Sequence, residues 1–272
     1  MAYSADELNQ YAAFALRLAD AARGQTLQYF RKRATVFNKA GVWFDPVTDA
    51  DREAERIVRR MIGKVFPDHG VLGEEFGEVE ADGPWRWVLD PVDGTRAFVC
   101  GVASWATLIA LEYEGDPILG IIDQPYTDEC WFGVNGKTVF RHGEDEVLCE
   151  TSGLTDLAKA RISTTDPRAN EYFRDHEAAT FERLTRASRL ARFSLDAYAY
   201  GLLAIGELDI VLEAGLQRHD FSALAPVIEG AGGVITNWSG EKLGADDRGE
   251  TLAAATPELH KAALAILNEK TN

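Results

Sequence analysis

The sequence predicts an α/β (α+β) fold built in layers, on three observations. Two stretches, residues 4–30 and 48–66, carry apolar residues three and four positions apart, which predicts amphipathic helices. Residues 87–142 form short apolar runs separated by turn residues, which predicts an antiparallel sheet. Beyond residue 156, short apolar strands alternate with helical stretches, which indicates helices packed on a sheet. The 272-residue length suits one or two domains.

In the first half, local signals place each element. Ser4 and Glu7 form the S-x-x-E pattern of a capping box, so a helix should begin there and continue to Phe30. Residues 34–44 alternate weakly, which predicts short paired strands. Thr48 opens a second helix with an acidic first turn. Further strands are expected at residues 87–89, 106–113, 117–123, 130–134 and 137–142.

In the second half, the periodicity changes. The acidic, polar segment 143–156 is predicted to connect two domains, 1–150 and 151–272. Strands are expected near 160–163, 189–193 and 210–213. Helices are expected near 167–175, 197–205, 223–229 and 257–268. The alternation of the two kinds of element predicts an α/β arrangement for this part.

Composition narrows the choice of partners. The chain has 44 acidic and 28 basic residues, a formal net charge of −16, so we expect it to repel nucleic acid and anionic membranes. The longest apolar stretch, 105–111, is too short to span a bilayer. The first ten residues lack signal-peptide features, and the spacing of Cys100, Cys130 and Cys149 suits neither zinc nor a disulfide framework. We therefore expect a cytoplasmic protein.

The stretch LDPVDGTRAF, residues 89–98, holds the most informative pattern. Asp90 ends a predicted strand, and Asp93 follows three residues later in a turn. Gly94 allows close approach of the backbone, and Thr95 could begin a helix whose free N–H groups bind an anion. Ligands of α/β folds bind in such crevices at strand ends. The alternative is a plain turn in which Asp93 caps the helix.

Three further acidic groups accompany this stretch. Each has a plain structural interpretation: a solvated edge, residues that complement a helix dipole, and a helix N-cap. Glu74 and Glu75 would be the solvated edge. Asp49, Asp51 and Glu53 would complement the helix dipole, and Asp220 would be the N-cap. Taken together with the central aspartates, they are hard oxygen donors without a cysteine or histidine cluster, which suits Mg²⁺ or Mn²⁺ rather than Zn²⁺. The pattern predicts a multi-metal site for phosphoryl chemistry.

Four separated motifs resemble the inositol monophosphatase superfamily. They are DPVTDAD, GEE, WVLDPVDGTRAF and HDFSALAPVIEGAGG, and they run in the family's order between about Lys39 and Gly233. The strings TLIAL, LGIIDQP, DAYAYGLLA and APVIEGAGGVITNW are most similar to bacterial histidinol-phosphate phosphatases of the inositol-monophosphatase type. The resemblance implies a layered αβαβα sandwich and, usually, a homodimer.

The resemblance also implies a ligand set for two to three Mg²⁺ ions, with Mn²⁺ as the alternative. Glu74, Asp90 and the carbonyl of Val92 would hold one ion. Asp90, Asp93 and Asp220 would hold a second. The cations would spread the charge that develops on the phosphoryl oxygens and would activate the attacking water.

Other roles carry over to neighbouring positions. A third, weaker ion would lie near Glu74 and Asp51. Thr95, with Asp51 and Glu74, would position the attacking water, so no covalent nucleophile need be invoked. The backbone N–H groups of Gly94 and Thr95 would bind a phosphate oxygen, and Asp93 and Asp220 would also contact the substrate. Lys39 either contacts the anion or is a solvated lysine.

Two acids in the second half bear on the substrate. Asp196 opens a predicted helix, where it either caps the helix or faces the ligand, and Glu213 ends a predicted strand. In the family the matching glutamate faces the end of the substrate opposite the phosphate. Two carboxylates there would favour a cationic group such as an alkylammonium. His219 is either structural or part of the pocket wall beside Asp220.

The chain departs from the family pattern on the substrate side. Ser194 and Leu195 stand where the histidinol-phosphate branch usually carries glycines, and His219 stands where an aromatic residue commonly precedes the last metal aspartate. The prediction is a Mg²⁺-dependent phosphomonoesterase that acts on L-histidinol phosphate. The alternatives are an inositol-1-phosphate or other small sugar or polyol phosphatase, and a non-catalytic metal- or phosphate-binding protein on the same fold.

Overall fold

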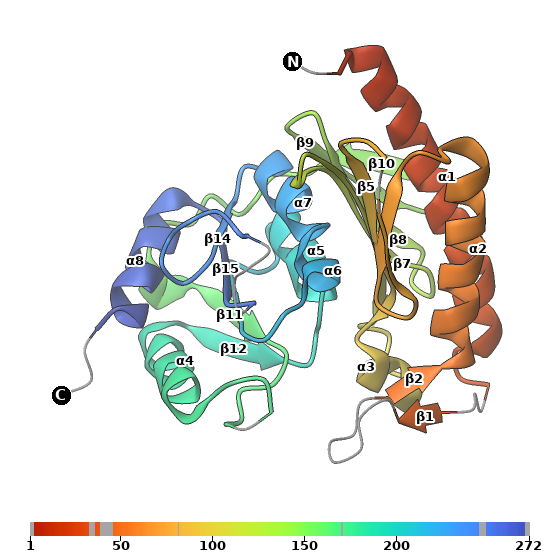
Figure 1. Cartoon of the computed structure of the whole chain (residues 1–272). Helices are drawn as coiled ribbons and strands as arrows, with labels where there is room; N and C mark the ends of the chain where they lie inside the picture. Colours follow the sequence, from red (N-terminus) through yellow and green to blue (C-terminus); the bar gives the residue numbers. More distant parts are fainter. Residues whose placement is uncertain are drawn as a thin grey trace.

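Helices and sheets alternate in five layers (Figure 1). The computed structural model describes residues 3–32, 36–38, 46–80, 82–169, 171–244 and 249–269. A helical pair covers one face of a large sheet, three shorter helices lie between that sheet and a smaller one, and a second helical pair covers the far face of the smaller sheet. The predicted αβαβα sandwich is therefore confirmed.

The first outer layer consists of α1 (Ala5–Tyr29) and α2 (Asp49–Val65). The predicted capping box of Ser4 and Glu7 begins α1, and α2 begins after Thr48 as predicted, where Thr48 and Asp51 form a second capping box. Their apolar sides share a core with the large sheet, in which the rings of Phe14 and Trp87 lie 5.6 Å apart. A small pair of antiparallel strands, β1 (Val36–Asn38) and β2 (Pro46–Thr48), precedes α2. Lys39, and the rest of the predicted strands within residues 34–44 apart from β1, lie outside the described residues.

The large sheet has the strand order β10-β9-β8-β7-β6-β5-β3-β4, and all neighbours are antiparallel except β3 and β5. At its centre, the ladder between β5 and β6 is interrupted between Asp90 and Asp93. The strands are β3 (Gly70–Gly73), β4 (Gly77–Val79), β5 (Trp85–Asp93), β6 (Ala106–Tyr113), β7 (Asp116–Gln124), β8 (Glu129–Val134), β9 (Lys137–His142) and β10 (Asp145–Leu148).

The small sheet has the order β12-β11-β13-β15-β14, in which β11 is parallel to β12 and β13, and β15 is antiparallel to both of its neighbours. Its strands are β11 (Arg161–Thr164), β12 (Leu190–Phe193), β13 (Ile210–Glu213), β14 (Val234–Thr236) and β15 (Thr251–Ala254). The helices of the middle layer are α5 (Tyr198–Ala204), α6 (Arg218–Phe221) and α7 (Leu224–Gly230), and those of the outer layer are α4 (Asp175–Ala187) and α8 (Pro257–Leu267).

The middle helices lie tightly against the large sheet. A Cβ atom on Gly120 of β7 would come within 2.0 Å of the Ala223 carbonyl oxygen, so only glycine permits this approach. The resulting core includes Leu108 and Trp131 of the large sheet together with Val227 of α7. The predicted boundary near residue 150 separates the two sheets, but this core spans both parts, and the division into two domains stays a prediction.

Two predicted elements are wrong. The described residues of 167–175 do not form the expected helix, and α4 instead begins at Asp175, where the Glu177 carboxylate accepts a hydrogen bond of 2.6 Å from the N–H of the N-cap residue Arg174. The earlier segment is held by Asp166, which accepts hydrogen bonds from the backbone and side chain of Arg168. The segment 143–156, expected to be only a connection, contains strand β10 at the sheet edge. Two short helices, α3 (Thr95–Cys100) and η1 (Leu157–Lys159), complete the described elements.

Two expectations from composition can be compared with the structure. All three cysteines are free, and Cys130 and Cys149 are buried. Among the described helices, none combines the length and the apolar character that crossing a membrane requires.

Candidate metal centre and adjoining pocket

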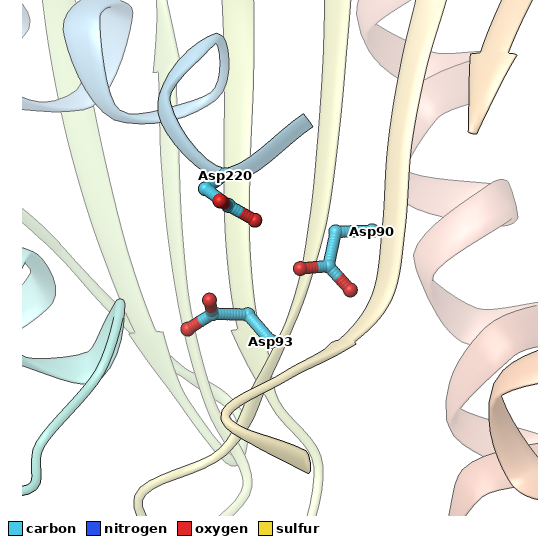
Figure 2. A group of neighbouring side chains, drawn as sticks. All are labelled: Asp90, Asp93 and Asp220. Atoms are coloured by element: carbon cyan, nitrogen blue, oxygen red, sulfur yellow. The ribbon is translucent and has the colours of Figure 1, made fainter. Parts of the chain in front are cut away.

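Three carboxylates meet at the carboxyl end of β5. Asp90 and Asp93 come from this strand, and Asp220 comes from α6 in the middle layer (Figure 2). One oxygen of each lies within 4.8 Å of the others. The structure therefore brings together three of the predicted metal ligands from two distant parts of the chain.

The end of β5 is shaped by local bonds. Asp90 Oδ1 accepts a hydrogen bond of 3.0 Å from the Val92 N–H. Gly94 adopts φ 78°, and a Cβ atom there would lie 2.9 Å from the Asp196 carboxylate, so glycine serves both the turn and the close approach. Thr95 begins α3 as predicted, and its hydroxyl donates to the Val92 carbonyl at 3.1 Å. The alternative in which Asp93 caps this helix is wrong, because Gly94 occupies the N-cap.

Asp220 is oriented by the start of α6. Gln217 is the N-cap, and its N–H donates to Asp220 Oδ2 at 2.6 Å, which leaves the other oxygen near His219 Nε2 at 3.4 Å. Asp220 therefore lies within the short helix rather than capping a helix that follows. His219 lines the pocket, which agrees with the second of its two sequence interpretations.

Glu74 lies in the turn between β3 and β4, which α2 holds in place. The buried carboxylate of Glu55 accepts hydrogen bonds from the N–H groups of Glu75 at 2.8 Å and Phe76 at 3.2 Å. Arg59 pairs with the same carboxylate at 2.6 Å. A Cβ atom on Gly73 would lie 2.1 Å from Glu55 Oε1, so the close contact requires glycine. These contacts fix the turn that carries Glu74.

Asp51 differs from the other predicted residues, because it does not line the pocket. It is fully buried at the start of α2, where Oδ2 accepts hydrogen bonds from the Thr48 N–H and hydroxyl. Its Oδ1 has no hydrogen-bond partner within the described part of the chain. Burial, and secondarily the charges of Glu75 and Glu74, raise the pKa of Asp51 to about 7.

The pocket beside the cluster has a volume of about 480 Å³. Apart from Asp51, every site residue predicted from the sequence lines it: Glu74, Asp90, Val92, Asp93, Gly94, Thr95, Asp196, Glu213 and Asp220. The wall also includes residues to which sequence reasoning assigned no role, among them Arg96, Thr165, Tyr172, Tyr200 and Gln217.

Two of these additional residues pack on each other. The Arg96 guanidinium lies 5.2 Å from the Tyr172 ring centroid, and it pairs with Glu171 at 3.1 Å. Arg96 stands inside the central motif and could have been considered from the sequence. Nothing in the sequence indicated that Tyr172 would line the pocket, because its segment was expected to be helical.

Asp196 and Glu213 are both in the pocket wall. Asp196 has φ 49° and does not cap α5, so the capping alternative is wrong. The next residue, Ala197, donates its N–H to Asp93 Oδ2 at 2.6 Å. The buried Glu213 carboxylate accepts from the Thr165 N–H at 2.7 Å, the Thr165 hydroxyl at 2.9 Å and the Thr164 hydroxyl at 3.2 Å.

The electrostatics of the pocket are strongly acidic. Burial raises the pKa of Asp90 well above its ordinary value, and the charges of Glu74, Asp93 and Asp220 add to this effect. The pKa of Asp93 rises for the same reasons, with Asp196 as the largest charge contribution. Burial also raises the pKa of Asp220, although His219 opposes the shift.

A divalent cation fits this donor set. Six acidic side chains line the pocket, against Arg96 and His219 as the basic ones among the described lining residues. So many carboxylates repel one another unless a cation or protons compensate their charge. Carboxylate oxygens, without a cysteine in the wall, are the ligands that Mg²⁺ and Mn²⁺ prefer.

Comparison with known proteins adds independent information. A model of the inositol monophosphatase family matches residues 7–272. The bifunctional phosphatase IMPL2, chloroplastic, of Arabidopsis thaliana is 42% identical over 87% of this chain and 67% of its own. A histidinol-phosphatase of Chlorobaculum parvum is 33% identical over 93% of this chain and 95% of its own. The structure of an inositol monophosphatase from Zymomonas mobilis superposes with a TM-score of 0.85 at 38% identity, over 98% of this chain and 100% of that one.

Proposed function

Because the chain belongs to the inositol monophosphatase family of metal-dependent phosphatases, we propose that it hydrolyses L-histidinol phosphate to L-histidinol and phosphate. This substrate is favoured by one observation: the carboxylates of Asp196 and Glu213 lie in the same pocket as the acidic cluster. Such a pair favours a phosphate ester whose other end is cationic. The similarity to the histidinol-phosphatase of Chlorobaculum parvum over nearly its whole length supports the same choice.

The proposed ligands for two Mg²⁺ ions, or Mn²⁺, are Glu74, Asp90, the Val92 carbonyl, Asp93 and Asp220, and a third, weaker ion would lie near Glu74 and Asp51. When bound, the ions supply positive charge to the phosphoryl oxygens and lower the pKa of a water molecule. The convergence of three carboxylates within 4.8 Å supports this assignment.

Thr95, Asp51 and Glu74 are proposed to orient the attacking water. The Thr95 hydroxyl donates its proton to the Val92 carbonyl, so its oxygen is left as an acceptor for a water proton. The Asp51 pKa of about 7 suits a group that accepts a proton near neutral pH. The backbone N–H groups of Gly94 and Thr95, at the start of α3, are proposed to bind a phosphate oxygen.

Glu213 and Asp196 are proposed to bind the ammonium group. Three hydrogen bonds from Thr164 and Thr165 fix the Glu213 carboxylate, so it does not need to be ordered when a ligand arrives. Burial raises the pKa of Glu213 to about 8, and a bound cation would favour its ionised form. A substrate without a cation would leave this acid buried and unpaired.

The test compares two esters. We expect Glu213→Gln to lower kcat/KM for histidinol phosphate about tenfold or more, because a charged hydrogen bond contributes about 1.5–3 kcal/mol. The same variant should leave hydrolysis of glycerol phosphate nearly unchanged. Asp196→Asn should act in the same direction. The Glu213 variant is the more informative of the two, because Asp196 lies close to the proposed metal ligand Asp93. If the ratio of the two kcat/KM values were the same in the wild type and the variants, neutral polyol phosphates would be equally good candidate substrates.

Inositol 1-phosphate, or another small sugar or polyol phosphate, is the second candidate substrate. It is favoured by the similarity to the inositol monophosphatase of Zymomonas mobilis along 98% of this chain. A panel of phosphate esters compared by kcat/KM on the wild-type protein would rank the candidates. The non-catalytic alternative predicts no phosphate release with Mg²⁺ present, which the same assay would detect.

We also propose a homodimer in the cytoplasm. The dimer is supported by the family resemblance, and the compartment by three cysteines that are all free. Light scattering coupled to size-exclusion chromatography would determine the oligomeric state.

A further inference from the structure

Glu112 of β6 is the centre of a buried ion-pair cluster, hereafter the Glu112 cluster, formed with Arg86, Arg218 and Ser222. The Glu112 side chain is 0% exposed. Arg86 donates to it from Nε at 3.0 Å and Nη2 at 2.8 Å, and Arg218 donates from Nε and Nη2, both at 2.9 Å. The Ser222 hydroxyl donates at 2.9 Å. One carboxylate therefore receives five hydrogen bonds.

The cluster joins the two elements that carry the converging aspartates. Arg86 lies on β5, directly opposite Glu112 in the ladder, and the same strand ends at Asp90 and Asp93. Arg218 is the first residue of α6, two positions before Asp220. Glu112 therefore connects the strand that carries two of the three converging aspartates with the helix that carries the third.

The short helix depends on contacts outside itself. α6 has four residues, which is far below the length at which a helix is stable alone. Arg218 begins it and Ser222 is its C-cap, so Glu112 holds both ends. Arg218 also donates to the Gly115 carbonyl at 2.8 Å, in the turn that follows β6. Meanwhile, repulsion between Asp220 and the carboxylates of β5 acts to separate the helix from the strand.

We propose that Arg218 and Glu112 are positioning residues for the metal centre, and that they hold α6 where Asp220 meets Asp90 and Asp93. This proposal rests on the assignment of these aspartates as metal ligands in the proposed function. Groups that orient metal ligands typically change metal affinity or activity about 10–100-fold when they are mutated. Arg218 is the better residue to test, because Glu112 keeps Arg86 and Ser222 as partners when Arg218 is replaced.

The experiment measures metal binding directly, without substrate. Mn²⁺ is titrated into the full-length protein and followed by electron paramagnetic resonance, and Mg²⁺ binding is measured by calorimetry. We expect Arg218→Met to raise the dissociation constant about tenfold and Arg218→Lys to raise it less, since lysine keeps the charge but loses the planar fork. At saturating Mg²⁺, kcat should return close to the wild-type value, because all ligands are still present.

The matched control is a second buried carboxylate with similar bonds. Asp209 accepts from Arg161 Nε at 2.8 Å and Nη2 at 3.0 Å and from Ser152 at 2.6 Å, at the start of β13, the end opposite Glu213. Asp209→Asn should lower stability but leave the metal dissociation constants unchanged. If Arg218→Met bound metal within twofold of the wild type, or if Asp209→Asn weakened binding equally, the proposal would be wrong.

Two further variants make every outcome decisive. If circular dichroism shows that Arg218→Met does not fold, the test uses Arg218→Lys instead. A metal dissociation constant equal to that of the wild type would then overturn the proposal, and a raised one would support it. Asp220→Asn tests the ligand itself. Normal metal binding in Asp220→Asn would refute both the ligand assignment and the positioning role. If Asp220→Asn lost metal binding while Arg218→Met bound metal normally, only the positioning role would be refuted.

Discussion

At the residue scale, Asp93 and Asp220 each combine a structural bond with a charge in the cluster. One oxygen of each accepts a backbone N–H at 2.6 Å, from Ala197 and Gln217 respectively. Asparagine keeps an acceptor oxygen for this bond but removes the charge. The two contributions of each side chain can therefore be separated by a single substitution.

We expect Asp93→Asn and Asp220→Asn each to lower kcat at least about 100-fold, because removal of one transition-state stabiliser costs about 2.7–4 kcal/mol. Each should also raise the melting temperature of the metal-free protein, because it removes a buried charge that repels its neighbours. Phosphate release at saturating Mg²⁺ and melting in EDTA measure the two effects. A variant with near-normal kcat would show that its aspartate is not a ligand.

His69 predicts how stability depends on pH. It is stacked among aromatic rings and accepts a hydrogen bond from Trp87 Nε1 at 3.2 Å. Burial lowers its pKa from 6.5 to about 4. Between these two values the unfolded chain binds a proton that the folded protein does not, so the free energy of unfolding contributed by this group falls as pH decreases from 6.5 to 4.

His69→Gln keeps an acceptor for Trp87 but cannot titrate, so we expect its unfolding free energy to fall less steeply over this pH range. Urea unfolding of both proteins at several pH values between 4 and 7 makes the comparison. Parallel curves would mean that His69 titrates normally in the folded protein.

Ser194, one of the departures from the family pattern, has a strained backbone conformation. It stands where the resembling branch carries glycine, and its φ of 62° lies in the left-handed region that glycine adopts without strain. We expect Ser194→Gly to raise the free energy of unfolding by about 1 kcal/mol. Ser188, with φ −103°, is the control, because glycine there should lower stability. Urea unfolding of both variants gives the comparison.

At the element scale, the turn between β3 and β4 depends on α2. Glu55 accepts the N–H groups of Glu75 and Phe76 and so fixes the turn that carries Glu74. We expect Glu55→Gln to lower the free energy of unfolding by about 1–3 kcal/mol and to raise the Mg²⁺ concentration for half-maximal activity. Glu182→Gln on α4, where an exposed pair with Arg186 is lost, should change neither quantity measurably.

At the scale of the whole molecule, the acidic cluster links stability to metal. Mg²⁺ should raise the melting temperature, because an ion that binds only the folded state stabilises it by about 2.7 kcal/mol at 100 times its Kd. Activity should disappear after exhaustive EDTA treatment and return with Mg²⁺. Melting curves and phosphate release with and without the chelator make the test, and full turnover in the metal-free protein would contradict it.

The sequence by itself determined the elements whose signals are local. The capping box at Ser4 placed the start of α1, Thr48 and its acidic first turn placed the start of α2, and the alternation of apolar runs and turn residues placed strands β5 to β9 of the large sheet. The turn of Asp90 to Thr95 was also readable, because glycine and the following helix start are requirements of nearby backbone geometry. The spacing and order of the motifs were enough to indicate the family.

Only the tertiary structure decided what surrounds these residues. It left Asp51 out of the pocket lining and put Arg96 and Tyr172 into it, and it placed α4 after the segment where a helix was predicted at 167–175. Arg218 and Glu112 are 106 residues apart in sequence, and neither belongs to a pattern that would pair them. Such contacts depend on the packing of two sheets against the middle helices, because long-range side-chain pairs form only where the whole fold brings distant segments together.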